Sequence, residues 1–161
     1  MYEILDKKTL APGFKELTFH APLIAAKIKP GQFVIMRVDE RGERIPMSIS
    51  DYDSKSLTTV VHEVGVTTKK LGELEVGEKI MNVVGPLGVP SAVKRYGHVI
   101  GICKGGTGAA LHPILRSLKE SGNRVTAILG ANSSEFLVYE DKIGAVCDEL
   151  LIATDDGTKG R

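Results

Sequence analysis

Two glycine-containing segments carry groups that bind phosphate in proteins. Gly105-Gly106-Thr107-Gly108 lies between a short β-rich run and a helical apolar pattern, where glycines let a pyrophosphate approach the N–H groups of a helix start. The segment lacks the third glycine and the acidic residue of the full dinucleotide motif, and no Lys-Ser or Lys-Thr follows it as in a Walker A loop. It predicts nucleotide binding, although a tight strand-to-helix turn without a ligand has the same pattern.

Gly65-Val66-Thr67-Thr68-Lys69 is the other such segment. A helix start, two hydroxyls and a lysine fit an anion cradle and a capped helix equally well. A third segment, Arg44-Ile-Pro-Met-Ser48-Ile-Ser50, combines a cation, an extended stretch and two hydroxyls, which can hold a phosphate and the edge of a flat heterocycle. Taken alone, the charges around Arg41 favour a solvated hairpin tip instead.

Side-chain acid–base chemistry has little support in the sequence. We find no Ser-His-Asp pattern, no His-Glu-x-x-His and no close carboxylate pair with an assignable role. Cys103 and Cys147 lie in apolar stretches and match neither a zinc site nor an iron–sulfur ligand set, so we interpret them as core thiols and expect no metal site.

Composition limits the class of protein. The 161 residues are 42% hydrophobic and 25% charged with a net charge of +1, which is typical of a globular chain and leaves no basic surplus for nucleic acid. The apolar runs are too short for a membrane span, and the charged first residues lack a signal-peptide pattern. We expect a cytoplasmic protein with neither nucleic acid nor membrane as a partner.

The apolar pattern divides the chain into two domains, residues 1–94 and residues 95–161. In the first, short apolar runs separated by turn signals predict six strands and hence a barrel, interrupted by one helix over Thr67–Glu75. The expected strands are Tyr2–Leu5, Lys15–His20, Gln32–Val38, Ile45–Ser50, Ser56–Val64 and Lys79–Val84.

The second domain alternates strand and helix. We expect strands at His98–Cys103, Val125–Leu129 and Glu149–Ala153, with helices over Ala110–Ser121, where Pro113 would fall in the first turn, and Phe136–Ile143. Such a three-stranded parallel sheet is incomplete, because a further helix should cover its other face. We expect Cys147, Leu150 and Ile152 to lie near that uncovered side.

Six segments occur in the order seen in the ferredoxin–NADP reductase superfamily, and the chain resembles that superfamily over nearly its whole length. The resemblance is greatest to the electron-transfer subunits of dihydroorotate dehydrogenase, sulfide dehydrogenase and NADH-dependent ferredoxin:NADP oxidoreductase. The segments are Lys29–Val34, Arg44–Ser50, Val64–Thr68, Val84–Gly88, Gly105–Gly108 and Thr154–Gly157.

The resemblance implies a six-stranded antiparallel Greek-key FAD-binding barrel followed by an incomplete Rossmann-like NAD(P)-binding domain. It implies that Arg44, Pro46, Met47, Ser48, His62, Gly65, Thr67 and Thr68 bind FAD, with Ser48 near flavin N5 as the residue closest to catalysis. Gly105, Gly106, Thr107, Gly108, Asp155 and Asp156 would bind the nicotinamide nucleotide.

Three departures from the superfamily pattern bear on these roles. Arg44 precedes Met47 by three residues where the usual arginine precedes the flavin-stacking residue by two, Lys104 stands at a position usually occupied by glycine, and Asn132 stands where many members carry arginine. Relatives also continue beyond Gly157 to a cysteine cluster that holds a [2Fe–2S] centre, which we expect here only in a longer chain or a partner subunit.

We therefore expect a flavoprotein that passes electrons between NAD(P)H and an iron–sulfur partner, either a larger oxidoreductase subunit or a ferredoxin. Two alternatives remain open: a truncated nucleotide-binding interaction module without turnover, and a stand-alone flavin reductase.

Overall fold

The computed structural model describes residues 1–160 and divides the chain into two compact units, Met1–Pro90 and Ser91–Arg161. The division falls after Pro90, slightly before the expected boundary at residues 94 and 95. The first unit contains two β-sheets, the second contains one, and each has its own helices.

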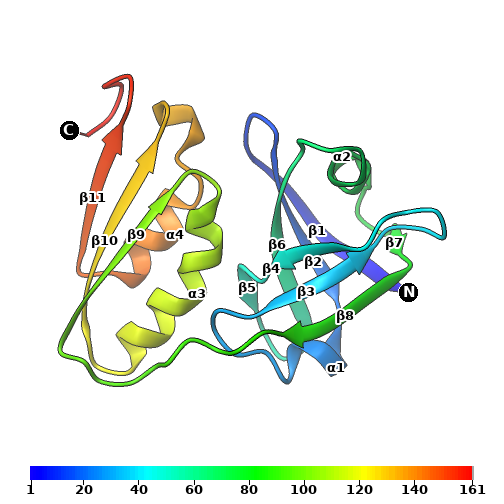
Figure 1. Cartoon of the computed structure of the whole chain (residues 1–161), viewed down its shortest axis with the longest axis horizontal. Coiled ribbons are helices and arrows are strands. Elements are labelled where there is room, and N and C mark those ends of the chain that lie inside the picture. Colours follow the sequence, from blue (N-terminus) through cyan, green and yellow to red (C-terminus); the bar gives the residue numbers. More distant parts are fainter. Residues whose placement is uncertain (161) are drawn as a thin grey trace. The chain divides into compact units, whose positions relative to one another are not determined.

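The first unit consists of two antiparallel sheets (Figure 1). One is three-stranded, with the order β4 (Ile45–Ser48), β3 (Phe33–Arg37) and β8 (Asn82–Leu87). The other is five-stranded, with the order β5 (Asp51–Tyr52), β6 (Ser56–His62), β2 (Phe14–His20), β1 (Tyr2–Ala11) and β7 (Lys79–Ile80).

The two sheets enclose one apolar core, so the expected barrel-like fold is confirmed although the sheets do not close completely. The single strand expected over Lys79–Val84 is instead two strands, because the chain changes partners at Met81. Residues before Met81 pair with β1 and residues after it pair with β3, while the Met81 amide donates to Val38 O at 2.9 Å. The fully buried core side chains include Ile4, Leu17, Phe19, Val34, Met36, Leu57, Val61 and Ile80.

Two helices complete this unit. The short α1 (Pro22–Ala25), which the apolar pattern does not predict, begins with proline and buries Ile24 against the core. Proline is tolerated there because the first helical N–H has no intrahelical acceptor. The predicted helix is present as α2 (Val66–Glu73), which is anchored to the core by the fully buried Leu71.

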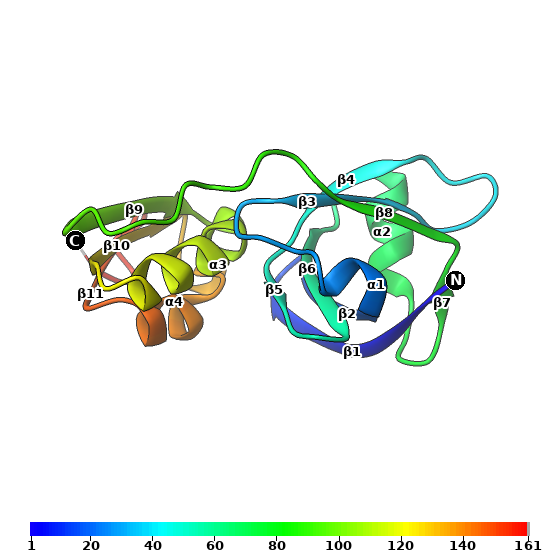
Figure 2. The ribbon, with the colours of Figure 1, turned by 90° about the horizontal axis from the view of Figure 1, so that it is seen from below.

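The second unit has a parallel sheet with the strand order β11 (Glu149–Thr154), β10 (Arg124–Ala131) and β9 (His98–Lys104). The helices α3 (Thr107–Glu120) and α4 (Glu140–Val146) lie on the same side of this sheet (Figure 2). A 3-10 turn, η1 (Ser134–Phe136), precedes α4. The strand–helix–strand order that the sequence predicts is confirmed.

Both helices differ from their predicted bounds. α3 begins at Thr107, so Pro113 lies inside the helix and not in its first turn. The missing N–H of Pro113 leaves the carbonyl of Ala109, one turn earlier, without its usual helical partner. α4 begins only at Glu140, because Tyr139 adopts a left-handed conformation with φ of 66° and interrupts the helical path.

The opposite face of the sheet carries exposed apolar side chains. Ile100 is 59% exposed, Ile102 is 71% exposed and Leu151 is 46% exposed. The expectation that Leu150 and Ile152 lie on this face was wrong by one residue. Leu150 pairs with the fully buried Ala127 and points toward α4, where a Cβ added at Gly144 would lie 3.5 Å from it. Cys147 precedes β11 and also lies beside Gly144.

We predict that substitutions on the two faces differ sharply in their effect on stability. Leu129→Ala removes a fully buried side chain and should lower the free energy of unfolding by about 2–5 kcal/mol. Ile102→Thr keeps a β-branched residue at an exposed position and should change it by less than about 0.5 kcal/mol. Urea unfolding followed by circular dichroism compares the two variants, and an equal loss would show that the face carrying Ile102 is packed.

Candidate functional site

The segment Arg44–Ser50, which the sequence analysis singled out, includes strand β4, and several of its side chains lie on the exposed side of this strand. Pro46 and Ser48 point outward, whereas Met47 between them is only 8% exposed and belongs to the core. Arg44, just before the strand, is also exposed. The structure therefore brings Arg44, Pro46 and Ser48 to one surface. It separates Met47, also expected to bind FAD, from them, because successive side chains of a strand alternate between its faces.

β4 also offers backbone groups to a ligand, because it is the edge strand of its sheet. The Ile49 amide donates to Gln32 O, and in the same register Met47 lies opposite Val34. Alternation in an antiparallel pair then directs the backbone groups of Pro46 and Ser48 away from β3 and toward the open edge. Proline suits this position because its missing N–H faces away from the neighbouring strand.

The start of α2 is closed by a threonine. The Thr68 hydroxyl accepts a hydrogen bond from the Gly65 amide at 3.0 Å and lies 3.1 Å from Gly65 O, to which it donates. A Cβ added at Gly65 would meet only this hydroxyl, at 3.8 Å, so a ligand can approach the Gly65 backbone closely. The amides of the first helical turn have no intrahelical acceptor and favour an anion.

The turn between β3 and β4 folds onto α2. Thr67, which is 8% exposed, donates its hydroxyl to Glu43 Oε2 at 3.4 Å, and Lys70 forms an ion pair with Asp39. Hydrogen bonds from Lys70 and from the Arg41 amide lower the pKa of Asp39. Between this turn and α2 lies a cleft of about 300 Å³, lined by Val38, Asp39, Arg41, Gly42, Glu43, Val66, Thr67 and Lys70.

His62 ends β6, three residues before Gly65. Its ring stacks on Phe14 with a centroid distance of 4.1 Å and an interplanar angle of 10°. Phe14 is buried while His62 is exposed. The imidazole thus covers the buried Phe14 ring at the surface near the start of α2, and its other face is open to a ligand.

In the second unit the glycine segment forms the turn from β9 into α3. The Thr107 hydroxyl accepts from the Lys104 amide at 3.0 Å and donates to Lys104 O at 2.7 Å, which fixes the turn. Gly105 has φ of 53° and donates its amide to Gly130 O at 2.8 Å. Gly108 is buried, and a Cβ there would lie 3.0 Å from Val138 O, so its contribution is close packing of the helix.

Gly105, Gly106 and Thr107 thus remain at the surface, where Gly106 precedes the first residue of α3. The amides at this helix start lie at the carboxyl edge of a parallel sheet, where α/β folds bind nucleotides. A phosphate group therefore fits this edge.

Both acidic residues that follow β11 lie at the same carboxyl edge. The Asp155 amide donates to Ala131 O, and the Asp156 amide donates to Asn132 O. The Asp156 carboxylate accepts hydrogen bonds from the hydroxyl and the amide of Thr158, which lower its pKa. Asp155 instead pairs with Lys104, with 2.7 Å between Nζ and Oδ2.

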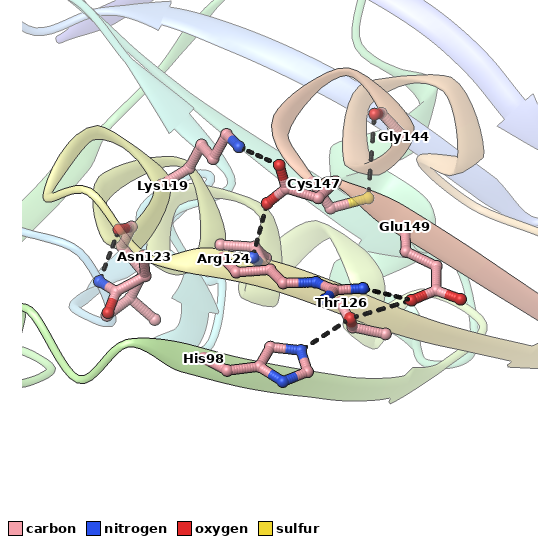
Figure 3. Close-up of polar contacts among 11 residues, drawn as sticks. His98, Lys119, Asn123, Arg124, Thr126, Gly144, Cys147 and Glu149 are labelled. Carbon is pink, nitrogen blue, oxygen red and sulfur yellow. Dashed lines mark hydrogen bonds and ion pairs between the residues drawn. The ribbon is translucent and has the colours of Figure 1, made fainter.

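The amino edge of this sheet carries a separate polar group (Figure 3). His98 Nε2 lies 3.0 Å from the Thr126 hydroxyl, which approaches Glu149, and Glu149 pairs with Arg124 at 3.7 Å. Because strands β9, β10 and β11 are parallel, this group lies at the opposite end of the strands from the glycine segment. The amino edge therefore takes no part in the candidate nucleotide site.

The two cysteines do not suit an iron–sulfur cluster. Cys103 lies near the carboxyl end of β9 and Cys147 just before β11, so they are at opposite edges of the sheet. Burial raises the pKa of Cys103 to about 11 and also raises the pKa of Cys147. Both are free thiols with little thiolate character.

Sequence reasoning missed Glu43 as a neighbour of Thr67 and Lys104 as a partner of Asp155. The charged turn around Arg41 was interpreted as solvated, and no local pattern indicates that Asp39 and Glu43 contact residues 31 and 24 positions further along the chain. Within residues 1–160, no helix is long and apolar enough to cross a bilayer.

No protein-family model matches the sequence. The chain is 40% identical, over 98% of its length and 56% of the relative's length, to a dihydroorotate dehydrogenase B (NAD(+)) electron transfer subunit homolog of Thermotoga maritima. The solved structure of an NADH-dependent reduced ferredoxin–NADP oxidoreductase is 38% identical with a TM-score of 0.94, over 99% of this chain and 58% of that one.

The flavohem-like FAD/NAD-binding domain of a Vibrio cholerae nitric oxide dioxygenase has the same fold. Its TM-score is 0.80 at 17% identity, over 99% of this chain and 78% of that domain. The chain spans little more than half the length of the curated relative and of the first solved structure. Its fold is that of the ferredoxin–NADP reductase family, and by sequence its relatives include electron-transfer subunits of dihydroorotate dehydrogenase B.

Proposed function

We propose that this chain is the flavin- and nicotinamide-binding part of an electron-transfer subunit. The observation that carries the proposal is its likeness, over nearly all of its length, to NADH-dependent reduced ferredoxin–NADP oxidoreductase. FAD would exchange electrons with NAD(P)H on one side and with an iron–sulfur partner on the other. The partner would be a larger oxidoreductase subunit or a ferredoxin.

Residues of the first unit would hold FAD, and their geometry supports this assignment. The exposed face of β4 offers Arg44, Pro46 and Ser48, while its open edge offers backbone groups to the rim of a flat heterocycle. The start of α2, with Gly65, Thr67 and Thr68, suits the pyrophosphate because its amides and the Thr67 hydroxyl are hydrogen-bond donors, while Thr68 fixes the turn. Met47 would support Pro46 from the core side, and His62 would border the ring.

Residues of the second unit would hold the nicotinamide nucleotide. Gly105, Gly106 and Thr107 present the start of α3 to a phosphate, and Gly108 lets that helix approach β10. Asp155 and Asp156 follow β11 at the same edge, where they suit hydroxyl groups of a ribose. The free thiols Cys103 and Cys147 suit a reducing compartment, and we infer a cytoplasmic location from them.

When bound, FAD supplies the redox chemistry by accepting hydride and releasing electrons singly. The chain itself needs no side-chain acid or base for this reaction. Its residues would orient the two cofactors, and the Ser48 hydroxyl would donate a hydrogen bond near N5 of the oxidised flavin, which makes that atom a better hydride acceptor. Orientation of this kind removes a large share of the activation barrier in reactions between two bound groups.

Loss of the Thr67 hydroxyl should weaken FAD binding. Thr67→Val keeps the shape of a buried side chain but removes a donor to the pyrophosphate, and a hydrogen bond to a charged group contributes about 1.5–3 kcal/mol. The Kd for FAD, measured by fluorescence quenching, should rise roughly tenfold or more. The control is Thr9→Val, at an exposed position of β1. An unchanged Kd in both Thr67→Val and Thr68→Val would refute the pyrophosphate assignment.

Ser48→Ala should retain FAD but slow its reduction. Removing the hydroxyl loses one hydrogen bond near flavin N5, and we expect a reduction rate lower by about tenfold with a more negative flavin potential. Stopped-flow absorbance and a redox titration measure both quantities. Ser54→Ala, in the turn between β5 and β6, serves as control, and wild-type rate and potential in Ser48→Ala would exclude this role.

NADH should reduce the flavin faster than NADPH. Asn132, Ser133 and Ser134 follow β10, and none of them can neutralise a 2′-phosphate as an arginine would. Arg124 lies at the amino edge and so is badly placed to supply that charge. Stopped-flow reduction with each nucleotide at matched concentration tests this preference, and comparable rates would count against it.

A further inference from the structure

An ion pair crosses the carboxyl edge of the sheet in the second unit. Lys104 is the last residue of β9, and its Nζ reaches Asp155, after β11, at 2.7 Å. To do so the side chain passes over β10 at Gly130, where an added Cβ would lie 3.8 Å from Lys104 Cγ. A glycine on the middle strand thus leaves the path for this lysine open.

This edge would be unfavourable for a pyrophosphate without a cation. Asp155 and Asp156 both follow β11 and are exposed, and the Asp156 carboxylate is held by Thr158. A dinucleotide brings two further negative charges to the start of α3, within a Debye length of these carboxylates. The amides of one helix start offset only part of that repulsion.

Lys104 is well placed to provide the missing charge. Its backbone is fixed by Thr107, the first residue of α3, through hydrogen bonds at both its amide and its carbonyl. Its side chain is 59% exposed and therefore free to turn from Asp155 toward a ligand. Two other cations of this unit are engaged elsewhere, Arg124 with Glu149 at the amino edge and Lys159 with Glu140.

Resting on the proposed function, we propose that Lys104 is a nucleotide-binding residue whose ammonium group pairs with the pyrophosphate of a nicotinamide dinucleotide. In the absence of nucleotide, Asp155 holds the lysine across the sheet edge. The pyrophosphate is shared by NAD and NADP, so Lys104 strengthens the binding of both without choosing between them. This role differs from that of the glycines, which allow close approach but carry no charge.

The test measures binding of NAD⁺ and NADP⁺ to the full FAD-loaded chain by isothermal titration calorimetry. The oxidised nucleotides do not reduce the flavin, so binding is separated from turnover. Lys104→Ala should raise both Kd values about tenfold, and binding should become less sensitive to salt. Lys104→Arg should retain most of the affinity, because it keeps the charge.

Lys119→Ala is the matched control, since Lys119 forms an ion pair with Asp148 near the other end of the strands. It should leave both Kd values unchanged. A loss confined to NADP⁺ would place Lys104 at the 2′-phosphate and overturn the pyrophosphate assignment. Equal effects of Lys104→Ala and Lys119→Ala would overturn any direct role for Lys104.

A double variant separates contact from charge neutralisation. If Lys104 only screens Asp155, Lys104→Ala should have no further effect on affinity in an Asp155→Asn background, and that result would overturn the proposed contact. If Lys104 touches the pyrophosphate, Lys104→Ala should still lower affinity relative to the Asp155→Asn single variant. A wild-type chain that binds neither nucleotide would instead refute the proposed function itself.

Discussion

The alternation of side chains along its strands determines which groups of this molecule can meet a ligand. On β4 it turns Met47 into the core and leaves Pro46 and Ser48 outside, together with Arg44 just before the strand. The same alternation, combined with the position of β4 at a sheet edge, directs backbone groups of Pro46 and Ser48 outward. A shift of one residue would bury the polar set and expose the apolar one.

Two strands lead directly into helix starts that present backbone amides at the surface. α2 begins after β6 and α3 begins after β9, and each is closed by a threonine that bonds to the residue three positions earlier. The hydroxyls of Thr68 and Thr107 therefore form hydrogen bonds within the turn itself. The groups left for a phosphate are chiefly backbone amides, which explains why a glycine directly precedes each helix: an amide without a neighbouring Cβ can be approached closely.

Local patterns were enough to predict the barrel-like first unit, the β9–α3–β10 crossover and both glycine turns, since each depends on residues near in sequence. What they missed depends on distant partners. Met81 gives no local sign that the chain changes sheets there, and Leu150, Leu151 and Ile152 are consecutive apolar residues without alternation, so their facing could not be assigned. The contacts of Glu43 with Thr67 and of Lys104 with Asp155 join segments 24 and 51 residues apart.

In both contacts a carboxylate occupies groups that could bind an anion. At each helix start a carboxylate of the chain lies near groups that suit an anionic ligand: Glu43 beside Thr67, and Asp155 beside Lys104. A carboxylate is a weaker ligand for such groups than a phosphate with more charge and more acceptor oxygens, and both carboxylates are exposed enough to move aside. In the proposed sites the chain's own acids would therefore satisfy these donors between binding events, and each incoming phosphate would replace an existing contact.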